Sequence, residues 1–476
     1  MQVSRITVFI LEHAARATAV VLPGDLAADK ALSDYFRANP KVGAFERGVA
    51  AETAYSVIRN RRSLGEMSGA RSPRAMALAS LARFSGLNTR QFEAILKPSE
   101  MELVERVKAA RAEDLPAPVR LDLPDWLYER LAAELGEAET EALALACKEP
   151  AALDLRVNAF KATREEMLTQ LHEAGIAAEP TPYSPLGLRL KTKPALTKNP
   201  LFMAGKIEVQ DEGSQLLSVL VAPKRGEMVA DFCAGAGGKT LALGALMRST
   251  GRLYAFDVSE GRLKKFSPRL KRSGLSNVHA VRITNENDLK IKRLAGKMDR
   301  VLVDAPCSGL GTLRRNPEIK WRQLPEHIAE LAVKQTNILA GASRMVKPGG
   351  RLVYATCSVL AAENQDIARA FLAANSDFNL VRADEVLKQA GIEIADSGGE
   401  FLVLRPHKHG TDGFFAAVME RKAAEKLPKP VAAKAAAVTV TAAAATDGVA
   451  TEAATAAATA AATAATTANP AAAEPA

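Results

Sequence analysis

Apolar residues recur at intervals of three and four along the first 146 residues, the spacing that places them on one face of an α-helix. The clearest helical segments are expected over residues 6–22, 50–59, 76–85 and 126–135. Prolines separate these segments, because a proline cannot donate the backbone hydrogen bond that a helix interior needs. They stand at positions 40, 73, 98, 116 and 118. The pattern predicts an all-helical N-terminal domain over residues 1–146, with RNA binding as a candidate role.

The pattern changes over residues 147–205, where short apolar runs surround one helical segment. Strands are expected over residues 153–156, 176–180 and 186–190, and a helix is expected over residues 164–174. Short strands beside a single helix predict a small α+β module.

Over residues 206–422, continuous apolar runs alternate with helical patterns. Strands are expected over residues 228–232, 253–256, 278–283, 300–303, 351–355, 401–404 and 414–419. Helices are expected around residues 212–221, 240–248, 259–273, 326–346 and 361–374. This alternation predicts an α/β fold with a mostly parallel, seven-stranded sheet and helices on both faces. Ligands bind such sheets at the carboxyl ends of the strands, so those ends are where chemistry is expected.

Composition changes this picture at the C-terminus. Residues 431–476 contain 25 Ala and 9 Thr, and only four charged residues. Such a segment cannot bury enough apolar surface to offset its loss of conformational entropy, so residues 423–476 are expected to form a disordered tail. Residues 1–430 contain 62 Lys and Arg against 51 Asp and Glu, a net charge of +11 compared with +9 for the whole chain. This balance favours an anionic partner such as a nucleic acid.

The composition also excludes several classes of protein. No apolar run approaches the roughly 20 residues of a membrane span, and Glu12 and His13 interrupt the N-terminal apolar run before it reaches the length of a signal-peptide core. The four cysteines are scattered without Cys-x-x-Cys spacing, so neither a disulfide framework nor a zinc site is expected. We expect a cytoplasmic, monomeric protein with no metal and no membrane partner.

A glycine-rich loop follows the expected strand 228–232. It comprises Cys233, Ala234, Gly235, Ala236, Gly237, Gly238 and Lys239. Its end matches a phosphate-binding P-loop, but the first glycine of that motif would have to replace the cysteine. An adenosine-binding loop instead requires an acidic residue about 20 positions further on, at the end of the next strand. Asp257 meets this requirement, so an adenosine-type ligand is favoured, with a P-loop nucleotidase as the alternative.

Two cysteines follow two further strands. Cys307 lies in residues 304–309 (DAPCSG), and Cys357 lies in residues 356–358 (TCS). A thiolate that adds to C6 of cytosine makes C5 nucleophilic, and a carboxyl group bonded to N3 stabilises the charge that develops. A base must then remove the C5 proton so that the thiol can leave. Nearby cations would lower the pKa of a thiol that acts in this way, and the candidates are Lys239, Arg314 and Arg315.

These motifs together resemble those of the RNA cytosine-5 methyltransferase family that includes RsmB and the Sun-type proteins. The matching stretches span roughly residues 150–422, and they comprise residues 209–215, 233–240, 304–309, 356–358 and 410–415. The resemblance implies a Rossmann-like methyltransferase domain preceded by a small RNA-recognition-like module. It implies S-adenosylmethionine as the cofactor and RNA as the substrate, with 16S-type ribosomal RNA expected and tRNA as the alternative. DNA cytosine methyltransferases share a Pro-Cys at this place but not the additional Thr-Cys-Ser.

The resemblance also implies catalytic roles. Cys357 would be the nucleophile that attacks C6, and Cys307 would assist release of the product. Asp304 would act beside them and also contact the cofactor. A non-catalytic RNA-binding assembly factor with a retained pocket is the alternative outside the enzymes.

Further cofactor contacts are implied for the glycine-rich loop and for Asp257. In the family an acidic residue after the third strand contacts adenine, and Asn285 and Asp288 stand nearest to that place here. The loop departs from the family pattern because Gly235 and Ala236 replace Ala-Pro.

Basic and aromatic residues are expected to contact RNA. Arg314, Arg315 and Lys320 would hold phosphates, and Trp321 would stack on a base. Arg156 and Lys161 would extend this surface over the small module. The alternative for residues 313–322 is a solvated loop with a packed tryptophan.

Overall fold

The computed structural model describes residues 5–423. The Ala/Thr-rich tail expected over residues 423–476 lies, apart from its first residue, outside the described part of the chain. The described helices contain none that is long and apolar enough to cross a membrane.

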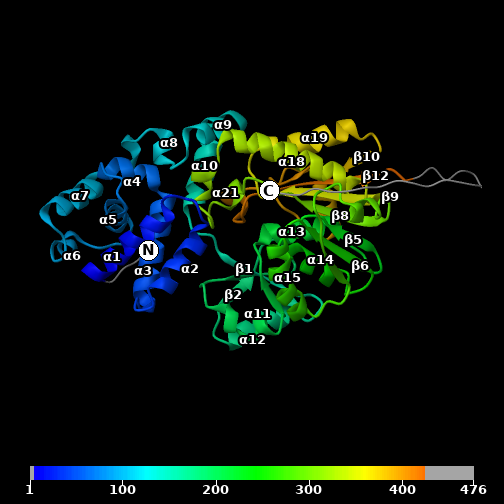
Figure 1. Ribbon diagram of the computed structural model, residues 1–476, viewed down its shortest axis with the longest axis horizontal. Coiled ribbons are helices and arrows are strands. Elements are labelled where there is room, and N and C mark those ends of the chain that lie inside the picture. The colour runs from blue at the N-terminus through cyan, green and yellow to red at the C-terminus, as the bar shows by residue number, and fades with distance from the viewer. Residues whose placement is uncertain (1–4, 424–476) are drawn as a thin grey trace, which may run out of the picture. The chain divides into compact units, whose positions relative to one another are not determined.

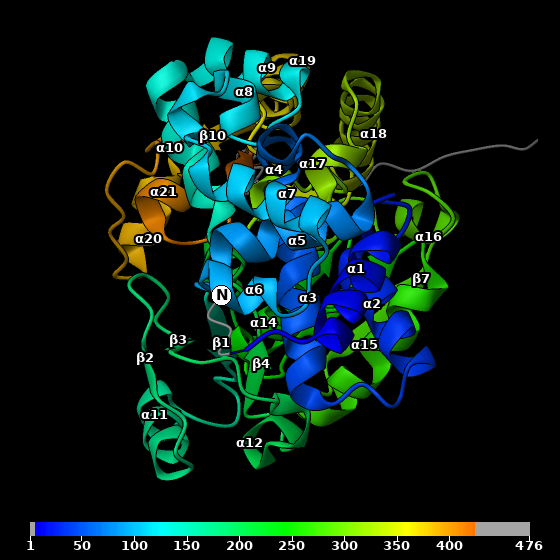
Figure 2. The ribbon, with the colours of Figure 1, turned by 90° about the vertical axis from the view of Figure 1, so that its left-hand side faces the viewer.

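The N-terminal region is helical, as its apolar spacing indicates. Its helices are α1 (Val8–Val21), α2 (Ala28–Ala38), α3 (Ala44–Arg59), α4 (Arg61–Ser68), α5 (Pro73–Phe84), α6 (Thr89–Glu93), α7 (Pro98–Ala109), α8 (Ala117–Arg120), α9 (Asp125–Leu135) and α10 (Glu137–Lys148). Pro73 and Pro98 are the first residues of α5 and α7, where a missing backbone N–H costs nothing. Helices α1, α3 and α5 pack together around the buried side chains of this region (Figure 2).

Helices α9 and α10 pack differently from the helices before them. Leu127, Leu131 and Leu143 form a buried cluster with Leu310 and Leu360, which lie far along the chain. The last two helices of the region expected as one N-terminal domain therefore share their core with residues 310–360.

The small module contains a four-stranded antiparallel sheet in the order β2-β3-β1-β4. Its elements are β1 (Leu153–Val157), α11 (Arg164–Glu173), β2 (Ala178–Pro180), β3 (Gly187–Leu190), α12 (Pro200–Met203) and β4 (Ile207–Val209). The apolar pattern predicted the first three strands. Strand β4 was missed, and it pairs with β1 although it lies beyond residue 205.

The larger sheet has the order β10-β12-β9-β8-β5-β6-β7, with β11 paired to β12. Its strands are β5 (Met228–Asp231), β6 (Arg252–Asp257), β7 (Val278–Arg282), β8 (Met298–Asp304), β9 (Val346–Thr356), β10 (Phe378–Val381), β11 (Leu402–Leu404) and β12 (Phe414–Arg421). Strands β5 to β9 are parallel, and β12 is antiparallel to its neighbours. The predicted α/β fold is confirmed, with β10 as an additional strand that the sequence pattern did not indicate.

Helices cover both faces of this sheet, as Figure 1 shows. They are α13 (Glu212–Val221), α14 (Gly238–Leu246), α15 (Glu260–Ser273), α18 (Pro325–Ser343), α19 (Gln365–Ala374) and α20 (Ala383–Gln389), with the short helices α16 (Leu289–Lys292), α17 (Ile319–Arg322) and α21 (Pro406–His409) between them. One buried cluster contains residues of α18 and α19, and the other contains residues of α13, α14 and α20. The strand order reverses between β5 and β8, and an open α/β sheet binds its ligand at such a point.

Candidate cofactor and catalytic site

The glycine-rich loop between β5 and α14 is fixed to the end of β6. The backbone N–H of Gly235 donates to Asp257 Oδ2 at 2.8 Å, and the N–H of Ser259 donates to Asp257 Oδ1 at 2.7 Å. Gly237 has a φ of +81°, and a Cβ added there would lie 1.9 Å from the ring of Phe266 in α15. Only glycine fits this position, so the loop can lie close against α15 while its backbone stays open to the cavity.

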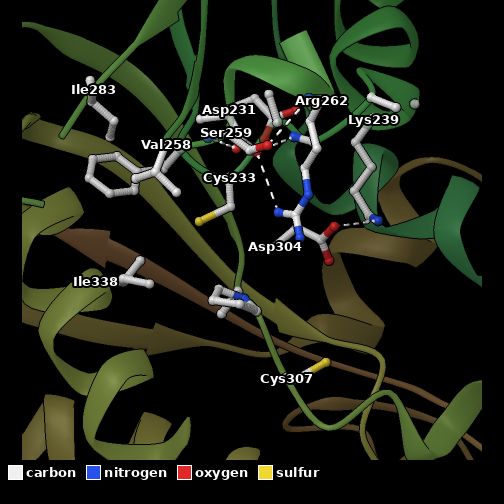
Figure 3. A pocket seen from close by; sticks show the side chains of 18 of the residues that line it. Asp231, Cys233, Lys239, Val258, Ser259, Arg262, Ile283, Asp304, Cys307 and Ile338 are labelled. Atoms are coloured by element: carbon white, nitrogen blue, oxygen red, sulfur yellow. Dashed lines mark hydrogen bonds and ion pairs between the residues drawn. The ribbon is translucent and has the colours of Figure 1, made fainter. Parts of the chain in front are cut away.

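A cavity of about 770 Å³ opens at the ends of β5, β6 and β8 (Figure 3). Predicted cofactor residues that line it are Cys233, Ala234, Gly235, Ala236, Gly238, Lys239, Asp257, Asn285 and Asp304. The two cysteines Cys307 and Cys357 line the same cavity, and Val258, Ile283 and Ile338 give it an apolar side. The structure thus brings the cofactor and catalytic candidates into one space.

Two predicted cofactor residues lie outside this lining. Gly237 serves the packing against α15 described above. Asp288 caps the N-terminus of α16, where its carboxylate accepts the N–H groups of Thr284 and Lys290 at 2.9 Å each. Of the two candidates for the adenine contact, Asn285 therefore lines the cavity and Asp288 does not.

Lys239 and Asp304 form an ion pair across the cavity. Lys239 Nζ lies 2.7 Å from Asp304 Oδ2, and the lysine side chain is only 13% exposed. Burial by itself would lower the pKa of Lys239, but the carboxylate of Asp304 outweighs it and raises that pKa. Lys239 is therefore charged and already paired with a carboxylate, unlike a P-loop lysine that is free to meet a phosphate.

The thiols of Cys307 and Cys357 lie side by side, with their Sγ atoms 3.3 Å apart. They follow the neighbouring parallel strands β8 and β9, in which Asp304 is opposite Ala355. The hydrogen bond to Cys357 and burial together raise the pKa of Cys307 well above its ordinary value. Both cysteines are free thiols.

Asp231 is a residue of the site that the sequence reasoning missed. It ends β5 and lines the cavity, and it is 1% exposed. Its Oδ2 accepts the hydroxyl of Thr240 at 2.7 Å, whereas its Oδ1 has no partner within the described chain. Burial raises the pKa of Asp231 from 3.8 to about 7. An aspartate that ends an apolar strand directly before a glycine-rich loop was the signal that could have identified it.

Several residues predicted to contact RNA are used inside the protein instead. Arg156 is 2% exposed and donates to Gln210 Oε1 at 2.6 Å. Lys320 is 4% exposed and donates to the carbonyl of Arg59 at 3.0 Å, and burial lowers its pKa to about 8. Trp321 Nε1 donates to the carbonyl of Ile58 at 2.7 Å. The prediction that Arg156 and Lys320 contact RNA is corrected, because both side chains are buried. Trp321 is half-buried and joins its segment to α3.

The other predicted RNA contacts are also occupied. Arg314 Nη1 donates to the carbonyl of Gly410 at 3.0 Å, and Arg315 pairs with two aspartates. Neither arginine bonds to the thiols, so the expectation that they lower a thiol pKa is not supported, and Lys239 is the predicted cation that shares the cavity with the cysteines. Lys161 is exposed, but its Nζ donates to the carbonyls of Ala204 and Arg272.

Comparison with known proteins identifies the family. Residues 218–420 match the family model described as 16S rRNA methyltransferase RsmB/F, and residues 123–197 match the ferredoxin-like domain of the same group. The chain belongs to the RsmB/F methyltransferase family. It is similar to the probable ribosomal RNA small subunit methyltransferase B of Synechocystis, with 37% identity over 302 residues, which is 63% of this chain and 66% of that protein.

Solved structures agree with this assignment. A methyltransferase homologue from Pyrococcus horikoshii is 31% identical, and the similarity covers 64% of this chain and 97% of that one with a TM-score of 0.55. The crystal structure of PH0851 is 27% identical and covers 88% of this chain and 100% of that one with a TM-score of 0.74. The family match covers the cavity residues from the end of β5 to the end of β9.

The predicted cofactor, S-adenosylmethionine, is confirmed by this membership, and the donors around the cavity fit it. Asp231, Asp257 and Asp304 end three adjacent strands, and the unpartnered oxygen of Asp231 suits a cationic group. A carboxylate at Asp257 suits ribose hydroxyls. A nucleotide triphosphate would be repelled by the carboxylate of Asp257, and the Lys239 ammonium that could hold a phosphate is already paired with Asp304. The P-loop alternative is therefore not supported.

The residues described by the structure contain no cluster of three or more His, Cys, Asp or Glu side chains suited to hold a metal ion.

Proposed function

We propose that this protein is an RNA cytosine-5 methyltransferase that acts on small-subunit ribosomal RNA. The observation that carries the proposal is the pair of thiols, 3.3 Å apart, in the same cavity as the glycine-rich loop and Asp257. The name of the Synechocystis relative supports ribosomal RNA as the substrate class. S-adenosylmethionine supplies the methyl group when it is bound.

In this proposal Cys357 is the nucleophile. Its thiolate adds to C6 of the cytosine and makes C5 electron-rich. Asp304, through a proton supplied by its ion-pair partner Lys239, donates a hydrogen bond to N3 and stabilises the negative charge on the ring. The raised pKa of Cys307 supports this division of roles, because it favours Cys307 as the thiol that keeps its proton. Cys357 then receives a hydrogen bond from a neutral neighbour rather than repulsion from a second thiolate.

Release requires two bonds to break. After C5 has gained the methyl group, a base removes the C5 proton, and its electron pair re-forms the C5–C6 double bond. The bond between Cys357 Sγ and C6 breaks in the same step, and the thiolate leaves. Cys307, in contact with this sulfur, is placed to assist the elimination. The target cytosine must be unpaired or flipped out of a helix to reach the thiol.

Substituting each cysteine in turn distinguishes the roles of the two thiols. Cys357→Ala is expected to abolish transfer of label from methyl-tritiated S-adenosylmethionine to RNA. Cys307→Ala is expected to allow attack but slow release, so that RNA remains covalently attached under denaturing conditions. A denaturation-resistant adduct formed by Cys357→Ala would contradict the assignment. Cys147→Ala is the matched control, because Cys147 is buried outside the cavity.

The substrate is tested in cells. Bisulfite sequencing of total RNA, with and without the gene, should show one or more cytosines in 16S-type ribosomal RNA that lose protection when the gene is absent. Loss of protection in tRNA instead would favour a tRNA enzyme. Binding of RNA and cofactor without any transfer of label would favour a non-catalytic assembly factor.

A further inference from the structure

A fully buried glutamate lies behind the two thiols. Glu363 ends the short helix η4 (Ala361–Glu363) and is 0% exposed. Within the described chain, no cation forms an ion pair with it. Four donors surround its carboxylate instead: Ser308 N at 2.8 Å, Ser308 Oγ at 2.5 Å, Ser358 Oγ at 2.5 Å and Gln335 Nε2 at 3.0 Å. A buried carboxylate is tolerated only when hydrogen bonds replace its hydration, and here they do.

Two of these donor residues belong to the loops that carry the thiols. Ser308 directly follows Cys307, and Ser358 directly follows Cys357. One carboxylate therefore holds the two loops that carry the thiols. The serine hydroxyls also contact each other at 3.2 Å, so the two loops meet on Glu363.

Neighbouring side chains fix the same loops against their surroundings. Gln335 of α18, which bonds to Glu363, also donates to the carbonyl of Pro306 at 3.0 Å. Asn364 accepts the hydroxyl of Thr356 at 2.5 Å and donates to the carbonyl of Ser358 at 3.0 Å. The residues on both sides of each cysteine are thus held by side chains that lie behind the site.

Glu363 does not line the cavity that contains the thiols. It does not line the cofactor space and bonds to neither sulfur atom. Apart from its charge, which contributes to the raised pKa of Cys307, it acts on the site through the two loops that it holds. We propose that Glu363 is a positioning residue that sets the separation of the Cys307 and Cys357 thiols. Its consequence for catalysis rests on the proposed function, but its consequence for thiol geometry does not.

Two variants test this role at different strengths. Glu363→Ala removes the acceptor of all four of these hydrogen bonds. Glu363→Gln keeps the length and one acceptor oxygen, and its amide can still donate to both serine hydroxyls. Glu330→Gln is the matched control, because Glu330 lies exposed on α18, the helix that also carries Gln335.

The first measurement reports thiol geometry without RNA. A trivalent arsenical such as phenylarsine oxide binds tightly only when two thiols lie close together. Cys233 also lines the cavity, so this titration uses a Cys233→Ala background. Glu363→Ala is expected to weaken arsenical binding at least about 10-fold, because two-point attachment depends on proximity. Each thiol should still react singly with a disulfide reagent.

The second measurement reports the reaction. Glu363→Ala is expected to lower kcat about 100-fold, as a misplaced catalytic group does, while the KM for RNA changes less than about 2-fold. Glu363→Gln should recover part of this loss, to within about 10-fold of the unchanged protein. A uniform loss of stability would not produce this separation of kcat from KM.

The outcomes are distinct. Arsenical affinity and kcat that stay unchanged in Glu363→Ala would overturn the proposal, and so would an equal loss in Glu330→Gln. If Glu363→Ala does not fold, Glu363→Gln carries the test, and tight arsenical binding with full kcat in that variant would overturn the proposal. If the unchanged protein transfers no methyl group, the proposed function fails, while the arsenical titration still decides whether Glu363 holds the thiols together.

Discussion

Replacing Asp231 by asparagine is expected to stabilise the cofactor-free protein more strongly as the pH rises. Asp231 is 1% exposed, and burial raises its pKa from 3.8 to about 7. Asparagine has nearly the same shape, can still accept the hydroxyl of Thr240 and never ionises. The substitution therefore removes the cost of a buried negative charge and leaves the surrounding packing in place.

The direction of this pH dependence follows from the number of protons that the folded and unfolded states bind. Between pH values of about 4 and 7, the folded protein keeps a proton on Asp231 that the unfolded chain has lost, so the free energy of unfolding falls as the pH rises. Above about pH 7 both states are ionised and the effect is complete. A difference between 3.8 and about 7 corresponds to about 4 kcal/mol, at about 1.4 kcal/mol for each pKa step. About 2 kcal/mol is already present near pH 5, so the advantage of D231N should grow by roughly 2 kcal/mol between about pH 5 and pH 8.

Denaturant unfolding of both proteins at about pH 5 and pH 8, without cofactor, measures this growth. Comparing the two pH values removes any contribution of the amide that does not depend on ionisation. Asp25→Asn is the control, because Asp25 is exposed and its replacement should give the same difference at both pH values. An advantage of D231N that is equal at the two pH values would refute the conclusion that Asp231 titrates inside the folded protein.

Three other predictions use the same structure. Gly237→Ala should lower the free energy of unfolding by about 3 kcal/mol, and Gly235→Ala by about 1 kcal/mol. Both glycines have a positive φ, but only a Cβ at position 237 would meet an aromatic ring. Equal losses in denaturant unfolding would contradict this prediction. Arg315→Ala should destabilise by about 3 kcal/mol, and more at about pH 8 than at about pH 5, because two largely buried aspartates lose their cation; an unchanged unfolding curve would contradict it. Hydrogen peroxide should convert the Cys307 and Cys357 thiols into a disulfide with release of water. Mass spectrometry would detect the loss of two hydrogen atoms, and dithiothreitol should reverse it. Two thiols that remain reactive after peroxide treatment would contradict this prediction.

The sequence predicted the position of the cavity because the ends of the parallel strands can be recognised from the apolar pattern. Apolar runs mark the parallel strands, and the residues that follow them meet at one edge of the sheet. Asp257, Cys307 and Cys357 were found in this way. Strand β4 and strand β10 were not, because a polar residue, Glu208 or Asn379, interrupts each short apolar run, and pairing with β1 and β12 defines them.

The hydrogen-bond partners of charged and aromatic side chains could not be predicted from the sequence. Arg156, Lys320 and Trp321 have the residue types of an RNA surface, but their hydrogen-bond partners lie far away in the chain, and only the fold brings them together. Burial of a lysine is uncommon enough that the sequence alone favours an exposed one. The same limit hid Glu363, whose partners Ser308 and Ser358 are defined by the meeting of two loops.

Arg315 gives a structural role to two of the stretches that resemble the family, residues 209–215 and 410–415. It donates to Asp211 at 2.9 Å, to Asp412 at 2.6 Å and to the carbonyl of Ala152 at 3.0 Å. Burial and the charge of Asp211 raise the pKa of Asp412 to about 6, and the guanidinium of Arg315 opposes that rise. One arginine thus joins the stretches 209–215 and 410–415 to the start of the small module. A charged residue beside a catalytic motif is therefore not by itself a contact to substrate, and the loss of Arg315 should change the stability of the protein more than its affinity for RNA.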